Sequence, residues 1–280
     1  MSDLSPILFG VSSSTCFGAG DFTGGFVTKK NNVFLVLLIS QIIGFSLLLI
    51  SALVFQEGFP TASQVFFALL AGTCGGVGLL SFYQGLSLGK AATVAPITAV
   101  ITPITPLVVN FIQEPLWEVQ HLLGFAVGMT AIWFVSNSKT ERRISLQELK
   151  LPVLAGLGFG SFQTFIHFAS TETSYFFPLV FARTSSLAMV FTIILLTKRY
   201  HKVTKQSFAL ISLTGVLDTL GNLFFVLSSQ TGRLDVAALL SSFGPAVVVF
   251  LAFLVVKEKI NRVQFLGLVL SLVSVLLFST

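Results

Sequence analysis

The chain has 280 residues, of which 54% are hydrophobic and only 10% are charged. So few charges could not cover a water-soluble protein of this length, and apolar runs of about 20 residues have the length of bilayer-spanning helices. The composition therefore predicts an all-α polytopic membrane protein, and the net charge of +5 indicates loops at an anionic membrane surface, not nucleic-acid binding.

Apolar runs interrupted by polar residues, glycine or proline predict ten transmembrane helices. The first run follows no basic segment and contains no small-residue cleavage site, so we interpret it as a retained helix and not a signal peptide. The predicted helices span 4–28, 33–55, 62–88, 92–112, 117–136, 151–171, 175–197, 206–230, 235–256 and 260–279.

Prolines fall inside the fourth and ninth predicted helices. Pro96, Pro103 and Pro106 lie in the fourth helix, and Pro245 lies in the ninth. Because proline lacks an N–H and clashes with the preceding turn, we expect both helices to be kinked.

Basic residues concentrate in the loops that follow the odd-numbered helices. The opposite loops contain only Arg233, and Arg183 lies inside a predicted helix. The positive-inside rule places the basic loops in the cytoplasm, and so predicts both termini on the non-cytoplasmic side of the cell (inner or plasma) membrane. The fourteen basic loop residues are Lys29, Lys30, Lys90, Lys139, Arg142, Arg143, Lys150, Lys198, Arg199, Lys202, Lys205, Lys257, Lys259 and Arg262.

A sequence pattern occurs twice, once between Gly75 and Ser136 and again between Leu217 and Ser279. Each copy has a glycine-basic pair, a proline-bearing apolar run, a glutamate, a Val-Gln pair and a last apolar run. An odd number of helices in each copy would make the copies antiparallel, as in many secondary transporters. We therefore predict two inverted five-helix repeats, 1–136 and 151–280, joined by the basic linker 137–150.

The chain resembles the EamA-type branch of the drug/metabolite transporter superfamily over essentially its whole length. The resemblance implies ten helices in two halves and transport of a small solute, since family members carry amino acids, nucleotide sugars, choline, drugs and other metabolites. Many relatives keep their termini in the cytoplasm, whereas the basic loops here predict the opposite orientation. The resemblance to the family rests on four stretches: Gly18-Ala19-Gly20-Asp21-Phe22, Val94-Ala95-Pro96 through Glu114, Leu217-Asp218-Thr219-Leu220-Gly221-Asn222 and Leu240-Ser241-Ser242-Phe243-Gly244-Pro245.

Four ionisable residues fall inside predicted helices, where a charge costs roughly 3 kcal/mol and indicates a function or a partner. Asp218, near the middle of its helix, is the principal candidate for substrate binding or proton coupling, followed by Asp21. Arg183 suits a substrate carboxylate or phosphate, or a structural ion pair with either aspartate. His167 lies near a helix end, where an interfacial histidine is the alternative.

Alignment of the two halves pairs Asp21 with His167 and Gln41 with Arg183, so we expect these residues to flank one central cavity. Neutral polar residues complete the predicted substrate-binding and coupling set: Tyr83, Gln84, Gln163 and Asn222. For Gln84, Asn222 and the further candidate Asn110, hydrogen bonds between helices are the alternative.

The sequence favours a secondary transporter that works by alternating access and moves a small polar or amphipathic metabolite, either amino-acid-like or another small organic solute. Proton coupling through Asp218 or Asp21 and uncoupled facilitation or exchange both remain open, since carboxyl groups in low dielectric can exchange protons near neutral pH. No nucleotide-binding motif, metal-ligand pattern or cofactor motif is present in the sequence. The expected partners are the solute, protons and the lipid bilayer.

An intramembrane aspartyl protease is the alternative from another class, because Gly18-Ala19-Gly20-Asp21 fits a G-x-G-D pattern and Asp218 supplies a second carboxylate. Such proteases place the other aspartate upstream of that pattern, where this chain has only Asp3. We therefore expect no enzymatic activity.

Overall fold

The computed structural model describes residues 4–28, 31–87, 91–113, 119–136, 146–197, 205–257 and 261–279. These residues form helices and short connections, with no β-strand among them. The helices are α1 (Ser5–Thr28), α2 (Val33–Val54), α3 (Ala62–Ser87), α4 (Ala91–Ile101), α5 (Ile104–Gln113), α6 (Val119–Ser136), α7 (Leu146–Ala169), α8 (Phe176–Thr197), α9 (Lys205–Thr231), α10 (Leu234–Ser241), α11 (Gly244–Leu251), the π-helix η1 (Ala252–Val256) and α12 (Arg262–Ser279).

Six of the described helical segments are long and apolar enough to cross a membrane by length and composition, and three further segments are apolar but shorter. The 24-residue α1 has a comparable length but carries several serines and threonines. Large apolar side chains stay exposed on the outer helix faces, for example Ile50, Leu53, Leu196 and Leu272. Such faces suit lipid and not water, and the chain is a multi-pass membrane protein.

The fourth and ninth predicted helices are both broken. Thr102 and Pro103 separate α4 from α5, and Ser242 and Phe243 separate α10 from α11, which begins at Gly244. The break in the fourth segment is confirmed at Pro103. The helix continues through Pro96, which lies inside α4.

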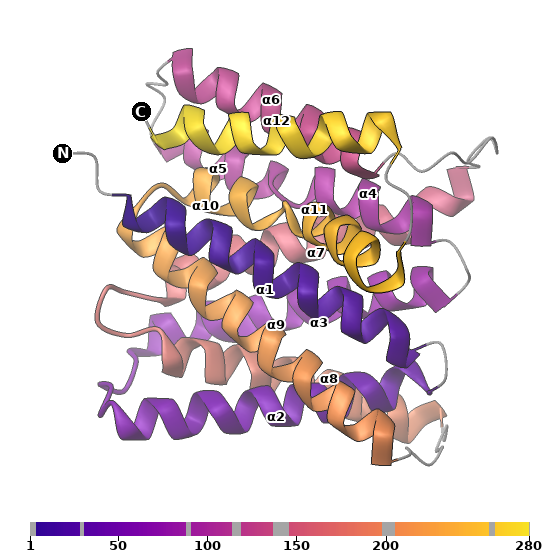
Figure 1. The fold of residues 1–280 in the computed structure, drawn as a ribbon. Helices are drawn as coiled ribbons and strands as arrows, with labels where there is room; N and C mark the ends of the chain where they lie inside the picture. The colour runs from indigo at the N-terminus through magenta and orange to yellow at the C-terminus, as the bar shows by residue number, and fades with distance from the viewer. Residues whose placement is uncertain are drawn as a thin grey trace.

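Helices from the two halves of the chain alternate through the bundle (Figure 1). The most extensive contacts join α1 to α9, α3 to α7, and α6 to α12, while α2 packs against both α8 and α9. The first turn of α1 and the last turn of α12 lie at the same end of the bundle (Figure 1). The two halves are therefore interleaved, and each contributes helices to the centre.

Glycines set the closest of these approaches. A Cβ on Gly72 of α3 would lie within 2 Å of the carbonyl oxygen of Ala182 on α8, and a Cβ on Gly158 of α7 would lie 2.7 Å from Gly78 of α3. Neither position tolerates a side chain without separating the helices. Small residues thus let backbones approach closely where helices pack in lipid.

Candidate functional site

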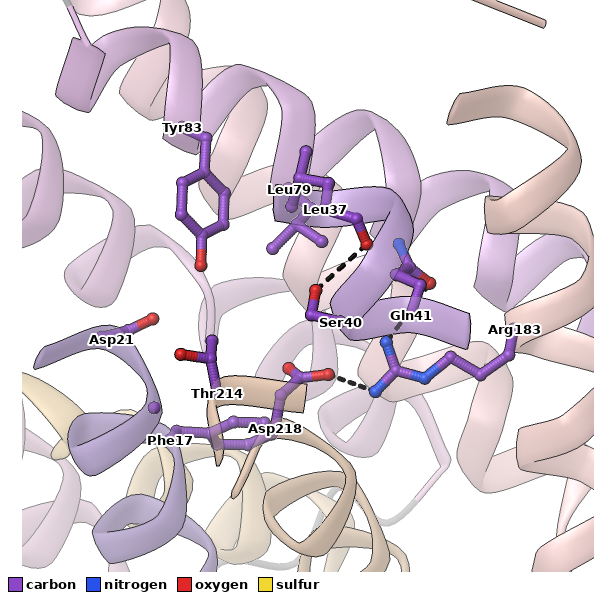
Figure 2. Close-up of a pocket in the computed structure, with 11 residues that line it drawn as sticks. Phe17, Asp21, Leu37, Ser40, Gln41, Leu79, Tyr83, Arg183, Thr214 and Asp218 are labelled. Atoms are coloured by element: carbon purple, nitrogen blue, oxygen red, sulfur yellow. Dashed lines mark hydrogen bonds and ion pairs between the residues drawn. The ribbon is translucent and has the colours of Figure 1, made fainter. Parts of the chain in front are cut away.

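A polar cavity lies between α1, α2, α3, α8 and α9 (Figure 2). Its volume is about 30 Å³ measured at the centres of water-sized spheres, which is room for water but not for a metabolite. The lining residues are Phe17, Gly20, Asp21, Leu37, Ser40, Gln41, Leu79, Tyr83, Arg183, Thr214 and Asp218.

An ion pair crosses the cavity. The guanidinium of Arg183 on α8 donates from Nη2 to Oδ2 of Asp218 on α9, and from Nη1 to Oε1 of Gln41 on α2 at 3.3 Å (Figure 2). Ser186 donates to the same oxygen of Gln41 at 2.6 Å. The Arg183 side chain is 11% exposed and that of Asp218 33%, so the pair is only partly shielded from the cavity.

Two further polar groups face the cavity without a hydrogen-bond partner among the described residues: the carboxylate of Asp21 and the phenol of Tyr83. Asp21 is exposed, and it lies on the face of α1 that carries Phe17 and Gly24, away from the lipid-facing Leu8 and Val11. Tyr83 is only 5% exposed, and its hydroxyl points toward Asp21 and Thr214 (Figure 2). Both groups therefore border the cavity.

Close packing of α2 on α9 brings the ion-pair residues within reach of one another. A Cβ on Gly215 of α9 would lie 2.5 Å from the backbone oxygen of Ser40, and a Cβ on Gly44 of α2 would lie 2.3 Å from Oγ1 of Thr219. Only glycine at these positions lets α2 and α9 approach so closely. Gln41 lies one helical turn before Gly44, so the same contact places its amide beside Arg183.

Five of the nine predicted site residues line this cavity: Asp21, Gln41, Tyr83, Arg183 and Asp218. The other four lie elsewhere. Gln163 is buried and donates to Oγ of Ser241 at 3.0 Å, and Asn222 donates to the backbone oxygen of Asp218 at 2.7 Å. Gln84 is exposed on α3, one residue from Tyr83, because adjacent helical residues point about 100° apart.

His167 was also expected beside Asp21 in the central cavity, and the structure places it elsewhere. It lies in the last turn of α7, where Nε2 of Gln230 donates to its backbone oxygen at 2.8 Å and lies 3.3 Å from its Nδ1. The side-chain amide of Gln230 on α9 therefore joins the end of α7 to α9 at this position. Asn110, the further neutral candidate, is buried near the end of α5.

The sequence analysis missed several lining residues, of which Ser40, Thr214 and Phe17 are the most informative. Thr214 and Phe17 each lie four residues before a predicted aspartate, and Ser40 lies next to Gln41. Residues four apart share a helix face. A search one helical turn before each predicted aspartate would therefore have identified Thr214 and Phe17.

A carboxylate from the connection between α2 and α3 caps the N-terminus of α8. Glu57, in the connection from α2 to α3, accepts hydrogen bonds from the backbone N–H groups of Tyr175, Phe176 at 2.9 Å and Phe177 at 2.6 Å. These are N–H groups at the start of α8, which has no acidic residue in its own first turn. Glu57 therefore caps α8 from another part of the chain and complements the positive end of its dipole.

Aromatic side chains pack around this cap. The rings of Phe55 and Phe176 stack with centroids 5.5 Å apart, and Phe59 contacts Phe177 and Phe181 at 5.5 and 5.7 Å. Gln56 adopts a left-handed backbone conformation, with φ of 51°, that turns the chain directly before Glu57. The connection between α2 and α3 is thus fixed on the N-terminus of α8.

No group of three or more His, Cys, Asp or Glu side chains among the described residues could hold a metal ion. The polar side chains that line the cavity carry two carboxylates, one guanidinium, one phenol, one amide and the hydroxyls of Ser40 and Thr214.

An interleaved bundle of apolar helices around an ionisable cavity is the architecture of membrane proteins that handle solutes within the bilayer. Residues 148–280 match the model of the EamA-like transporter family, which belongs to the drug/metabolite transporter superfamily. The resemblance predicted from the sequence is confirmed by this match, which covers the second half of the chain.

Two further comparisons found similar proteins. An uncharacterized protein of Methanocaldococcus jannaschii is 34% identical over 90 residues, which are 31% of this chain, and the chain spans 64% of that relative's length. A solved crystal structure of another protein has a TM-score of 0.81, with 99% of this chain and 97% of the other covered at 11% sequence identity. At that identity the likeness concerns the fold alone.

Proposed function

We propose that the protein is a secondary transporter that moves a small polar or amphipathic metabolite across the membrane. The observation that carries the proposal is the cavity in which Asp21, Arg183 and Asp218 meet inside the helix bundle. Ionisable side chains are costly within a membrane and mark solute or proton pathways. The match of residues 148–280 to the EamA-like transporter family supports the same class.

We further propose that the halves 1–136 and 151–280 are inverted repeats that open the cavity alternately to the two sides. The helix contacts support this proposal. Each of the most extensive contacts between two helices has a counterpart between the equivalent helices when the first and second halves are interchanged. The α1–α9 contact corresponds to α7–α3, the α2–α9 contact to α8–α3, and the α2–α8 and α6–α12 contacts to themselves. A metabolite does not fit the present cavity, so binding requires the helices to move.

Two carboxylates are candidates for proton coupling, and their surroundings differ. Asp218 forms an ion pair with Arg183, whereas Asp21 has no hydrogen-bond or ion-pair partner among the described residues. The sequence favoured Asp218 as the coupling group, and the ion pair shifts our preference to Asp21. Uncoupled facilitation or exchange is the alternative when neither carboxylate changes its protonation during transport.

The aspartyl protease alternative has one observation in its favour, which is that Asp21 and Asp218 line the same cavity. An aspartic dyad requires two adjacent carboxylates that share one proton. Here Asp218 accepts from Arg183, so its charge is balanced by a cation and not by a shared proton. The cavity is therefore better suited to binding a charged solute than to activating a water molecule.

Counterflow in proteoliposomes tests the proposed function. Purified protein would be reconstituted and preloaded in turn with amino acids and other small metabolites, and uptake of the labelled solute would be followed with and without a pH gradient. We expect accumulation of at least one solute above protein-free vesicles. Stimulation by the gradient supports proton coupling, equal rates indicate exchange, and no counterflow across the panel contradicts the transport proposal.

We propose that both ends of the chain face away from the cytoplasm, because fourteen of the sixteen basic residues lie in loops or helix ends assigned to the opposite side. Single cysteines at positions 2 and 279, in a chain with Cys16 and Cys74 replaced by serine, would be labelled by an impermeant maleimide in intact cells. Labelling that requires permeabilised cells would reverse the proposed orientation.

A further inference from the structure

We propose that the cavity binds a solute with a protonated amine, whose ammonium group contacts the carboxylate of Asp21 and the phenol oxygen of Tyr83. The proposal rests on the proposed transport function and names the chemical class of its substrate.

The charges around the cavity are unequal. Its lining contains two carboxylates, Asp21 and Asp218, and one guanidinium, that of Arg183. Arg183 donates to Asp218, and this contact leaves Asp21 as the unbalanced charge among the described lining residues. A carboxylate that borders the cavity without a cationic partner has no balancing charge there, so a bound cation would stabilise this side of the cavity.

The second observation is the orientation of Tyr83. This side chain is 5% exposed, yet no described residue is hydrogen-bonded to its hydroxyl, which points into the cavity toward Asp21 (Figure 2). A buried phenol normally has a hydrogen-bond partner. A solute ammonium donates several hydrogen bonds, and both the carboxylate of Asp21 and the phenol oxygen of Tyr83 are able to accept them.

The surroundings of these two groups also suit an organic cation. The ring of Phe17, one turn before Asp21 on α1, lines the cavity together with the apolar side chain of Leu79. Aromatic rings attract ammonium groups, and apolar walls accommodate the carbon skeleton of the solute. The site therefore favours an amine with an apolar substituent over a hydrated inorganic cation.

An anionic solute is disfavoured at the same site. The guanidinium of Arg183 already donates to Asp218 and to Gln41 at 3.3 Å, so an anion would have to displace at least one of these partners. It would also bring a third negative charge beside Asp21 and Asp218. A cation meets an acceptor that has no competing partner in the described structure.

Ligand-dependent melting of the detergent-purified protein tests the inference without requiring transport. The probes are 2-phenylethylammonium, the neutral 2-phenylethanol and the anion 3-phenylpropanoate, each titrated at pH 7 and constant ionic strength. We expect the ammonium to raise the melting temperature saturably and the other two to leave it unchanged. A larger shift with the anion, or equal shifts with the ammonium and the alcohol, would overturn the inference.

Variants assign the effect to the cavity. Asp21→Asn should weaken binding of the ammonium at least tenfold, while Asp21→Glu retains the charge and part of the affinity. Tyr83→Phe retains the ring and loses the acceptor, with about fivefold weaker binding expected for one hydrogen bond. The matched control is Glu172→Gln, an exposed carboxylate in the connection between α7 and α8, which should bind the ammonium as the wild type does. Unchanged affinity in a folded Asp21→Asn variant contradicts the proposal.

The melting experiment tests the amine site and the counterflow experiment tests transport, so either proposal can be rejected without the other. Binding of the ammonium through Asp21 without counterflow of any solute would retain the amine site and reject transport. Counterflow of neutral or anionic solutes that Asp21→Asn leaves unchanged would retain transport and reject the amine site.

Discussion

The proposed repeats pair Asp21 with His167, yet the surroundings of these two residues differ. Asp21 faces a cavity in which neither it nor Tyr83 has a hydrogen-bond partner among the described residues. The backbone of His167 accepts from Gln230, and its ring packs at 5.6 Å from that of Phe168. The comparison shows that residues paired by the proposed repeats need not have the same surroundings or the same role. One member of the pair is available to a ligand, and the other joins two helices.

The same contrast extends along α8. Near His167, the first turn of α8 is fixed by Glu57 and by stacked aromatic rings. About two turns further on, Arg183 reaches into the cavity beside Asp218. Contacts at the His167 side are therefore expected to control stability, and groups at the Asp21 side to control solute binding. Substitutions at Arg183, Glu57 and His167 test this division.

The largest effect is expected at the ion pair. Removing one partner of the pair leaves the other charge unbalanced, so Arg183→Gln should lower the free energy of unfolding by about 3 kcal/mol. This loss is near the low end for buried ion pairs because the side chain of Asp218 is one-third exposed. Transport should fall at least tenfold. Arg183→Lys should retain the fold but transport poorly, because lysine lacks the planar donor fork that contacts both Asp218 and Gln41.

A double-mutant cycle with Asp218→Asn provides the control for this prediction. Unfolding would be measured in detergent for both single variants and for the combined variant. We expect the combined loss to be at least 1 kcal/mol smaller than the summed single losses, because the second substitution removes the charge that the first leaves unpaired. Strict additivity would show that Arg183 and Asp218 do not stabilise one another.

An intermediate effect is expected at the cap of α8. Glu57→Gln removes a charge that accepts three backbone hydrogen bonds, and should lower the free energy of unfolding by about 1–2 kcal/mol. Thermal unfolding measures the loss, with Glu172→Gln as the control at a nearby exposed carboxylate. Amine binding should change less than twofold in Glu57→Gln. A loss of binding without a loss of stability would contradict the division between the two regions.

The smallest effect is expected at His167. The shorter contact with Gln230 uses the backbone oxygen of His167, so His167→Gln should change the free energy of unfolding by no more than about 0.5 kcal/mol. Counterflow rates should remain within twofold of the wild type. A tenfold loss of counterflow would show that the two repeat-related positions share a role despite their different surroundings.

Local sequence patterns predicted most of the helical framework. The apolar runs identified the membrane-embedded helices to within a few residues at most ends, and Pro103 and Pro245 marked the breaks between α4 and α5 and between α10 and α11. These features depend on neighbouring residues, because backbone hydrogen bonds inside a membrane must be satisfied within a helix and proline interrupts them. Of the predicted linker 137–150, residues 137–145 lie outside the described residues, as do the loop residues 198–204. Residues 146–150 form the first turn of α7, so the predicted start of that helix at 151 was wrong by five residues.

The sequence alone also named the chemical groups of the cavity, since a carboxylate or guanidinium within an apolar run is costly and indicates a function or a partner. Only the tertiary structure decided which of them meet. Arg183, Asp218 and Gln41 come together because Gly44 and Gly215 let α2 and α9 approach closely. Asp21 and His167 were both named as candidates from the sequence, and packing separates them, because Gln230 on α9 contacts His167 while open space remains beside Asp21. Contacts between residues far apart in the chain depend on how helix faces fit together, and that fit cannot be read from either helix alone.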